Sequence, residues 1–152
     1  MRWRRYHLLI TCALLACVGS GPVSADGAAL YTTHCVACHQ PDGNGAEGLA
    51  PPVAGVLGKL AGVPGGREYL AQVMVSGMVG KITSRGVKYD GSMPAVALTD
   101  EEMASVMGYV LSTFNASSEE IPAALFAKAR GKRMQPAAVR KQRERIRAEV
   151  GE

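Results

Sequence analysis

The segment Cys35-Val36-Ala37-Cys38-His39 constrains the folding and chemistry of this 152-residue chain more than any other stretch. Two cysteines three positions apart, with a histidine directly after the second, are compatible with three kinds of site. The cysteines could form a redox-active disulfide, supply half of a zinc site, or bind a haem covalently. Features elsewhere in the chain distinguish these alternatives.

The first 25 residues have the composition of an export signal. Three arginines precede an apolar run that ends at Val18, and Ala25 supplies a small residue before Asp26. The run is too short to span a bilayer comfortably, so we expect a signal peptide over residues 1–25 that is cleaved before Asp26. The sequence "LLAC", which ends at Cys17, also resembles a bacterial lipoprotein box, and cleavage before Cys17 would leave a lipid anchor. Both alternatives place the folded domain outside the cytoplasm, in the periplasm.

Export leaves few cysteines for the folded domain. Cys12 and Cys17 lie in the predicted export segment, so only Cys35 and Cys38 remain. A redox disulfide of the thioredoxin type needs a βαβ context, and no strand is predicted before the motif. A zinc site needs four ligands, and the two neighbouring histidines cannot easily join both cysteines around one tetrahedron. Covalent attachment is therefore favoured: each cysteine adds to one vinyl group of haem, and His39 binds the iron.

A haem iron has a second axial position, for which the sequence offers mainly methionines. His34 lies beside the attachment motif on the wrong side, and a lysine could bind in principle. Met93 stands out because it lies in a predicted loop, "YDGSMPA", where Pro94 stiffens the backbone behind it. The other methionines after the signal belong to predicted helices, to their ends or to the C-terminal segment: Met74, Met78, Met103, Met107 and Met134. Met93 is the predicted second ligand, and a thioether there would raise the reduction potential.

Apolar periodicity and capping signals predict mainly helices. Short helices are expected over residues 27–34 and 67–76. The strongest helix is expected over residues 98–114, where Thr99 and Glu102 have the spacing of a capping box.

Glycines and prolines interrupt these helices. The segments "QPDGNGAEGLAPP" and "GVKYDGSMPA" are predicted to be loops, the second with a turn at Asp90-Gly91. Gly108 lies inside the last predicted helix of the domain. It is either a tolerated weak position or a place where another helix approaches closely.

Charge separates the C-terminal segment from the domain before it. Residues 26–117 carry five Lys/Arg and eight Asp/Glu, whereas residues 118–152 carry nine and five. A helix is expected to begin near Pro136, which suits a first helical turn, and Arg143 interrupts its apolar face. One interpretation of the segment is an arm that docks on an acidic partner or on an anionic membrane surface. The other, which we favour, is a solvated or frayed extension. Nucleic acid is not an expected partner outside the cytoplasm.

Four motifs, in this order, resemble the class I (mitochondrial-type) monohaem c-type cytochromes over roughly residues 26–115. "GAALYTTHCVACH" is similar to the opening helix and attachment motif, "GLAPPVAG" to the loop after it, "YDGSMPA" to the methionine loop, and "LTDEEMASVMGYVLSTFN" to the closing helix. The longer stretch "YLAQVMVSGMVGKITSRGVKYDGSMPA" resembles bacterial cytochrome domains that serve periplasmic dehydrogenases and pass electrons to oxidases. The segment after Asn115 departs from the family pattern.

The resemblance implies an all-α class I cytochrome c fold. Three or more short helices would wrap around one covalently bound haem c, followed by a basic C-terminal helical extension. The cytochrome domain would span residues 26–116 and the extension residues 117–152. Gly27 and Tyr31 of the first helix would cross the last helix of the domain near Gly108 and Tyr109.

The resemblance also implies roles for individual residues. Four residues would bond to the haem or its iron: Cys35 and Cys38 as thioethers, His39 and Met93 as axial ligands. The carbonyl of Pro51, or of Pro52, would accept a hydrogen bond from the His39 ring and orient it. Tyr89 would reach a haem propionate.

An electron carrier rather than an enzyme is the expected function, because two axial ligands leave no iron position open to a substrate. The protein would pass single electrons from a periplasmic dehydrogenase, or another respiratory donor, to a terminal oxidase. One alternative is a fixed haem subunit of a dehydrogenase complex. Another is a haem sensor or haem enzyme with an open sixth position.

Overall fold

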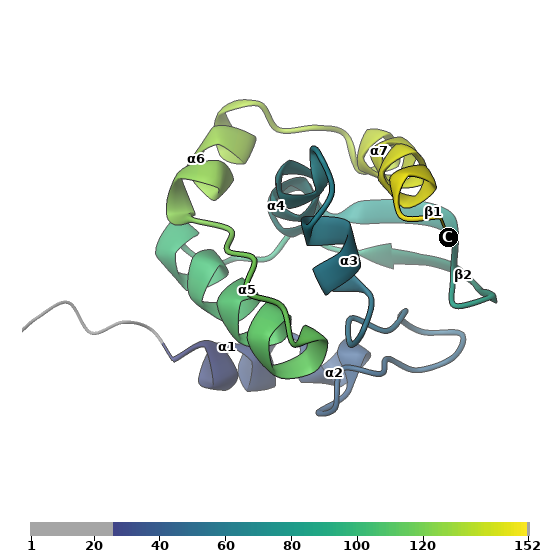
Figure 1. The fold of residues 1–152 in the computed structure, drawn as a ribbon, viewed down its shortest axis with the longest axis horizontal. Helices are drawn as coiled ribbons and strands as arrows, with labels where there is room; N and C mark the ends of the chain where they lie inside the picture. The colour runs from purple at the N-terminus through teal and green to yellow at the C-terminus, as the bar shows by residue number, and fades with distance from the viewer. Residues whose placement is uncertain (1–25, 152) are drawn as a thin grey trace, which may run out of the picture.

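The structure, a computed structural model, describes residues 26–151. It is mainly helical, as expected, with one two-stranded hairpin (Figure 1). The elements in chain order are α1 (Gly27–His34), α2 (Val36–His39), α3 (Leu57–Ala61), α4 (Gly66–Ser76), β1 (Met78–Ser84), β2 (Val87–Met93), α5 (Asp100–Asn115), α6 (Ala123–Gly131) and α7 (Pro136–Glu149).

Helix α1 crosses α5 at a point where only glycine fits. A Cβ atom at Gly27 would lie 2.4 Å from the carbonyl oxygen of Ser105 and 2.9 Å from the Cβ of Tyr109. The expected crossing of the first and last domain helices is therefore confirmed at Tyr109. The close-contact interpretation of Gly108 is wrong, because a Cβ there would meet nothing within 4 Å. The small residue that permits the contact lies on α1 instead.

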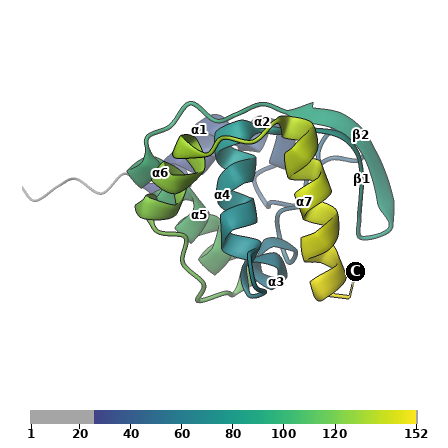
Figure 2. The ribbon, with the colours of Figure 1, turned by 90° about the horizontal axis from the view of Figure 1, so that it is seen from above.

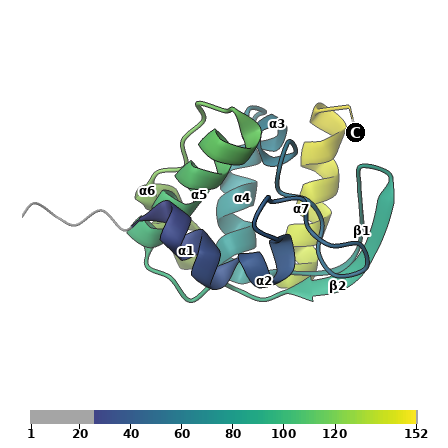
Figure 3. The same ribbon diagram turned by 90° about the horizontal axis from the view of Figure 1, so that it is seen from below.

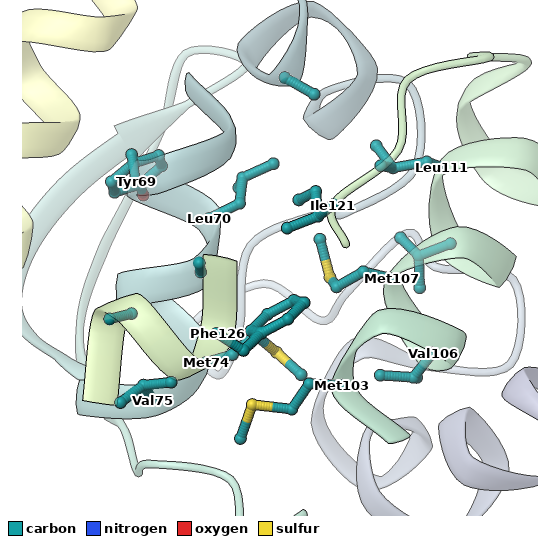
Figure 4. Close-up of a cluster of buried hydrophobic side chains, with 14 of the residues drawn as sticks. Tyr69, Leu70, Met74, Val75, Met103, Val106, Met107, Leu111, Ile121 and Phe126 are labelled. Atoms are coloured by element: carbon teal, nitrogen blue, oxygen red, sulfur yellow. The ribbon is translucent and has the colours of Figure 1, made fainter. Parts of the chain in front are cut away.

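Helix α5 begins with the predicted capping box. The Thr99 hydroxyl accepts a hydrogen bond from the backbone N–H of Glu102, and the Glu102 carboxylate accepts one from the backbone N–H of Thr99. One face of α5 is buried in the common core, and Figure 4 shows the packing of its methionines around Phe126. The buried residues of this face are Met103, Val106, Met107, Val110 and Leu111.

The segment after α4 is a β-hairpin, which corrects the predicted loop. β1 and β2 pair antiparallel, with Ser84 opposite Val87 and a two-residue turn at Arg85-Gly86. Both turn residues have positive φ, +49° and +79°, as the tight hairpin turns compatible with strand twist require. The expected turn at Asp90-Gly91 is wrong, because these two residues pair with β1. The hairpin forms because it buries Ile82 and Tyr89.

The C-terminal segment packs against the domain, so the expectation of a frayed extension is wrong. Helix α7 begins at Pro136, as predicted, and lies beside α4 and β1, whereas α6 lies against α4 and α5 (Figures 2 and 3). Segment 118–152 contributes several buried apolar residues to the common core: Ile121, Phe126, Ala129, Val139 and Ile146.

A buried polar side chain on α4 holds the connection between α6 and α7. The Gln72 amide donates to the carbonyl oxygen of Lys132 at 3.0 Å and to that of Ala129 at 3.4 Å. Its carbonyl oxygen accepts from the backbone N–H of Met134 at 3.3 Å and from the Ser76 hydroxyl at 2.9 Å. Because buried amides need partners, this network fixes one position of the connection on α4.

Candidate haem site

Two adjoining cavities lie between the attachment motif, the helices and the hairpin. Their empty volumes, with the open mouths included, are about 770 and 620 Å³. Cys35 borders the first cavity and Cys38 the second. Five residues border both: His39, Pro51, Met78, Ile82 and Met93. The mainly apolar walls suit a large, flat, hydrophobic group.

The two cysteines are presented by one helical turn. The backbone N–H groups of Cys38 and His39 both bond to the Cys35 carbonyl, at 3.1 and 2.8 Å. Burial, and then the neighbouring Cys38, raise the pKa of the Cys35 thiol to about 11. Because residues three apart on a helix lie on one face, both sulfurs are available to one ligand.

The His39 ring is oriented by a backbone carbonyl. Its Nδ1 lies 3.0 Å from the carbonyl oxygen of Pro51. A carbonyl only accepts, so Nδ1 donates, and in the neutral ring Nε2 carries the free lone pair. Burial lowers the pKa of His39, although the bond to Pro51 opposes this effect, so the neutral ring is favoured. The sequence allowed either Pro51 or Pro52 to accept this hydrogen bond, and in the structure Pro51 accepts it.

A glycine that the sequence did not single out brings Pro51 to this place. Gly45 has φ +69°, and a Cβ there would lie 2.7 Å from the Pro51 carbonyl oxygen and 2.3 Å from that of Ala50. Its N–H also donates to the His39 carbonyl at 2.9 Å. Gly45 therefore lets the two chain segments pass at close range, for a reason that no local pattern reveals.

Tyr31 fastens the attachment motif to the core. Its hydroxyl donates to the Gln40 carbonyl at 2.8 Å, and its ring packs against Tyr109 and Phe114. Burial, with a smaller contribution from Cys35, raises the pKa of Tyr31 to about 12. The hydroxyl is therefore a constant donor at neutral pH.

Met93 lies at the end of β2 rather than in an irregular loop. A Cβ at Gly77 would lie 2.5 Å from the Met93 carbonyl oxygen, so the end of α4 and this segment touch through backbone. The N–H of Val96 also donates to the carbonyl of Met74 at 2.9 Å. These contacts hold Met93 beside both cavities.

Met78 is a second methionine at the same place, directly opposite Met93 in the hairpin. It borders the same two cavities, and the sequence did not favour it. The hydroxyl of Tyr69 donates a weak hydrogen bond to its sulfur at 3.8 Å. The Met78 sulfur thus already accepts a hydrogen bond, which distinguishes Met78 from Met93.

Other polar residues border one cavity each. Tyr89 is buried and borders the second cavity. Tyr69, Ser84 and Arg143 border the first, and none of them is among the site residues expected from the sequence. Of these three residues, only Arg143 stood out in the sequence, because its charge interrupts the apolar face of α7.

Comparison with known proteins identifies the family. The family model of cytochrome c matches residues 24–114. The chain belongs to the cytochrome c family. It is 40% identical over 103 residues to a cytochrome c-552 from Thermus thermophilus, covering 67% of this chain and 69% of that protein. A second Thermus thermophilus cytochrome c-552 is 42% identical over 91 residues, covering 59% of this chain and 69% of the relative.

A third relative is the cytochrome subunit of fructose dehydrogenase from Gluconobacter japonicus. It is 32% identical over 108 residues, which cover 66% of this chain but only 21% of that subunit. Together the comparisons confirm the class I monohaem family and the cofactor, haem c bound through cysteine. Of the three chemistries open to the Cys35–His39 motif, haem attachment is the one that this family uses.

Within residues 26–151, no helix combines the length and the apolar composition that crossing a bilayer requires. The expected signal peptide and Cys17 lie outside the described residues.

Proposed function

We propose that this protein carries single electrons through a haem c bound by Cys35 and Cys38 and ligated axially by His39 and Met93. The observation that carries the proposal is the pairing of His39 and Met93 at the boundary of the two cavities, with the Pro51 carbonyl on His39 Nδ1. The hydrogen bond leaves Nε2 as the basic nitrogen, as an iron-binding imidazole requires.

The haem supplies the redox chemistry, a one-electron exchange between Fe(III) and Fe(II). The residues of the chain control its conditions. Pro51 orients His39 and increases its basicity, Met93 supplies a thioether, and Tyr89 binds a propionate on the side of the second cavity. With both His39 and Met93 bound to it, the iron would have no position open to a substrate, so we assign the protein as a carrier and not an enzyme.

The proposed site of electron entry and exit is the side of the second cavity. Cys38 is exposed there, and Leu49, 56% exposed, borders the cavity. A small apolar surface of this kind suits the weak, short-lived contacts of redox partners. We assign a periplasmic dehydrogenase or another respiratory donor as one partner and a terminal oxidase as the other.

The same proposal covers the domain boundaries and the location. Residues 1–25 are the export signal, with lipidation of Cys17 as the alternative, residues 26–116 form the cytochrome domain, and residues 117–152 form the basic extension. The mature protein works in the periplasm, where lipid on Cys17 or the basic extension would tether it to the membrane.

Three measurements on protein made in a host that matures c-type cytochromes test this function. The alkaline pyridine spectrum should show one attached haem, and a redox titration should show one electron. Carbon monoxide should bind the reduced protein slowly, because a bound ligand must leave first. Rapid binding would contradict a carrier with two axial ligands and support the sensor or enzyme alternative.

A second candidate is a fixed haem subunit of a dehydrogenase, which the likeness to the fructose dehydrogenase cytochrome subunit favours. Co-purification from the native host distinguishes the two. A free monomer supports the mobile carrier, whereas a stable complex with a larger catalytic subunit supports the fixed subunit.

A further inference from the structure

Three polar side chains interrupt the mainly apolar wall of the first cavity, which no acidic residue of the described chain borders. Tyr69 of α4, Ser84 of β1 and Arg143 of α7 all border it. These residues come from three elements that are far apart in the sequence, and α7 lies beside both α4 and β1 (Figure 2). The C-terminal segment therefore contributes a charged side chain to the wall of the haem cavity.

Both Ser84 and Arg143 are deeply buried, with 1% and 4% of their surface exposed. Burying a hydroxyl or a guanidinium is unfavourable unless the group is hydrogen-bonded or paired with an opposite charge. The Ser84 hydroxyl oxygen has no hydrogen-bond partner among residues 26–151. A hydrogen-bond acceptor in the cavity would satisfy it.

As far as residues 26–151 form it, the wall of this cavity carries a positive charge and no carboxylate. Among the described residues that border it, Arg143 is the permanently charged cation, and no Asp or Glu is among them. Arg143 also acts on Tyr69. Burial raises the pKa of Tyr69 to about 12, and the charge of Arg143 and its hydrogen bond to Tyr69 partly oppose this rise. A haem brings two carboxylates, and a guanidinium binds a carboxylate through two parallel hydrogen bonds.

We propose that Arg143 and Ser84 bind one haem propionate, so that the C-terminal extension forms part of the haem site. This inference rests on the proposed haem attachment. Tyr89, assigned above to a propionate, borders the other cavity and is independent of it. The extension would then supply part of the wall of the cofactor cavity, and Arg143 would have a role other than docking.

The proposal predicts how the reduction potential responds to charge. Ferric haem carries one more positive charge than ferrous haem, so a buried cation nearby favours the ferrous state. Arg143→Gln should lower the equilibrium constant for reduction about tenfold, which is about 59 mV for a one-electron couple. Arg143→Lys should restore part of this loss, because it keeps the charge and loses the two-pronged geometry.

Arg145→Gln is the matched control. Arg145 lies on the same helix, two residues away, and is exposed, so the same change of charge is screened by solvent. We expect it to change the equilibrium constant less than about threefold. Equal shifts in the Arg143 and Arg145 variants would overturn the proposal.

Ser84→Ala tests the hydroxyl without changing charge, and it remains informative if Arg143→Gln does not fold. If Ser84 donates to a propionate, the variant should lower both the potential and the free energy of unfolding. If the hydroxyl stays without a partner in the loaded protein, the variant should be as stable or more stable, with an unchanged potential. The second result would contradict the proposed contact.

The pyridine spectrum of each variant separates failure of this inference from failure of the proposed function. A protein that carries attached haem but has the same potential in all variants refutes only the propionate site. A protein without attached haem refutes the function as well.

Discussion

Met93 lies directly opposite Met78 across the β1–β2 hairpin, and both methionines border the two cavities that His39 also borders. The hydroxyl of Tyr69 contacts the Met78 sulfur at 3.8 Å. Two thioethers are therefore within the same region, and the hydrogen bond from Tyr69 to Met78 supports the proposal that Met93 is the one that binds iron.

Substitution of each methionine distinguishes the two. The ferric protein should show a methionine-to-iron charge-transfer band, which should disappear in Met93→Ala and persist in Met78→Ala. The Met93 variant should also have a lower reduction potential, because it loses the thioether. Loss of the band in the Met78 variant alone would assign the ligand to Met78.

Gly77 should control the position of Met93. It has φ +74°, and a Cβ atom would lie 2.5 Å from the Met93 carbonyl oxygen. Gly77→Ala should lower the free energy of unfolding by about 3 kcal/mol or more and weaken the charge-transfer band.

Gly86 provides the control for this substitution. Its φ is similar, +79°, but a Cβ there would meet nothing within 4 Å. Gly86→Ala should cost only about 1 kcal/mol, from backbone strain, and leave the band unchanged. Equal effects in denaturant unfolding would show that the contact with Met93 does not matter.

The α1–α5 crossing predicts opposite effects for two glycine substitutions. Gly27→Ala places a Cβ 2.4 Å from the Ser105 carbonyl and should destabilise the protein by about 2 kcal/mol. Gly108→Ala has open space and should stabilise α5 by about 1 kcal/mol through helix propensity. Thermal unfolding of both variants checks the signs, and a stabilising Gly27→Ala would refute the tight crossing.

The C-terminal segment should contribute to global stability. Phe126 on α6 is 0% exposed within the core shown in Figure 4, so Phe126→Ala should cost about 3–5 kcal/mol. Leu125→Ala, at a neighbour that is more exposed, should cost clearly less. If residues 118–152 were a frayed extension, neither substitution would change the denaturant midpoint.

Local chemistry explains which features the sequence alone could predict. The attachment motif, the helix over residues 27–34, the capping box at Thr99 and the helix start at Pro136 depend on neighbours a few residues away. Their physics is contained in short windows of sequence, so local patterns predict them correctly. The same motifs identified the family and its haem c.

Tertiary structure decided the features that depend on distant partners. Local patterns do not predict the hairpin turn at Arg85-Gly86, because an arginine rarely adopts positive φ, and only the burial of Ile82 and Tyr89 stabilises it there. Local patterns also do not show whether the close contact between α1 and α5 lies at Gly27 or at Gly108, because a glycine at either position would permit it.

Arg143 illustrates the same division. In the sequence it is a charge that interrupts an apolar face, which is typical of a solvated helix. In the fold, α7 lies against α4 and β1, so this side chain becomes buried and borders the first cavity. The sequence determined the cofactor, because covalent attachment needs only a short run of adjacent residues, whereas the walls of its cavity come from segments that only folding brings together.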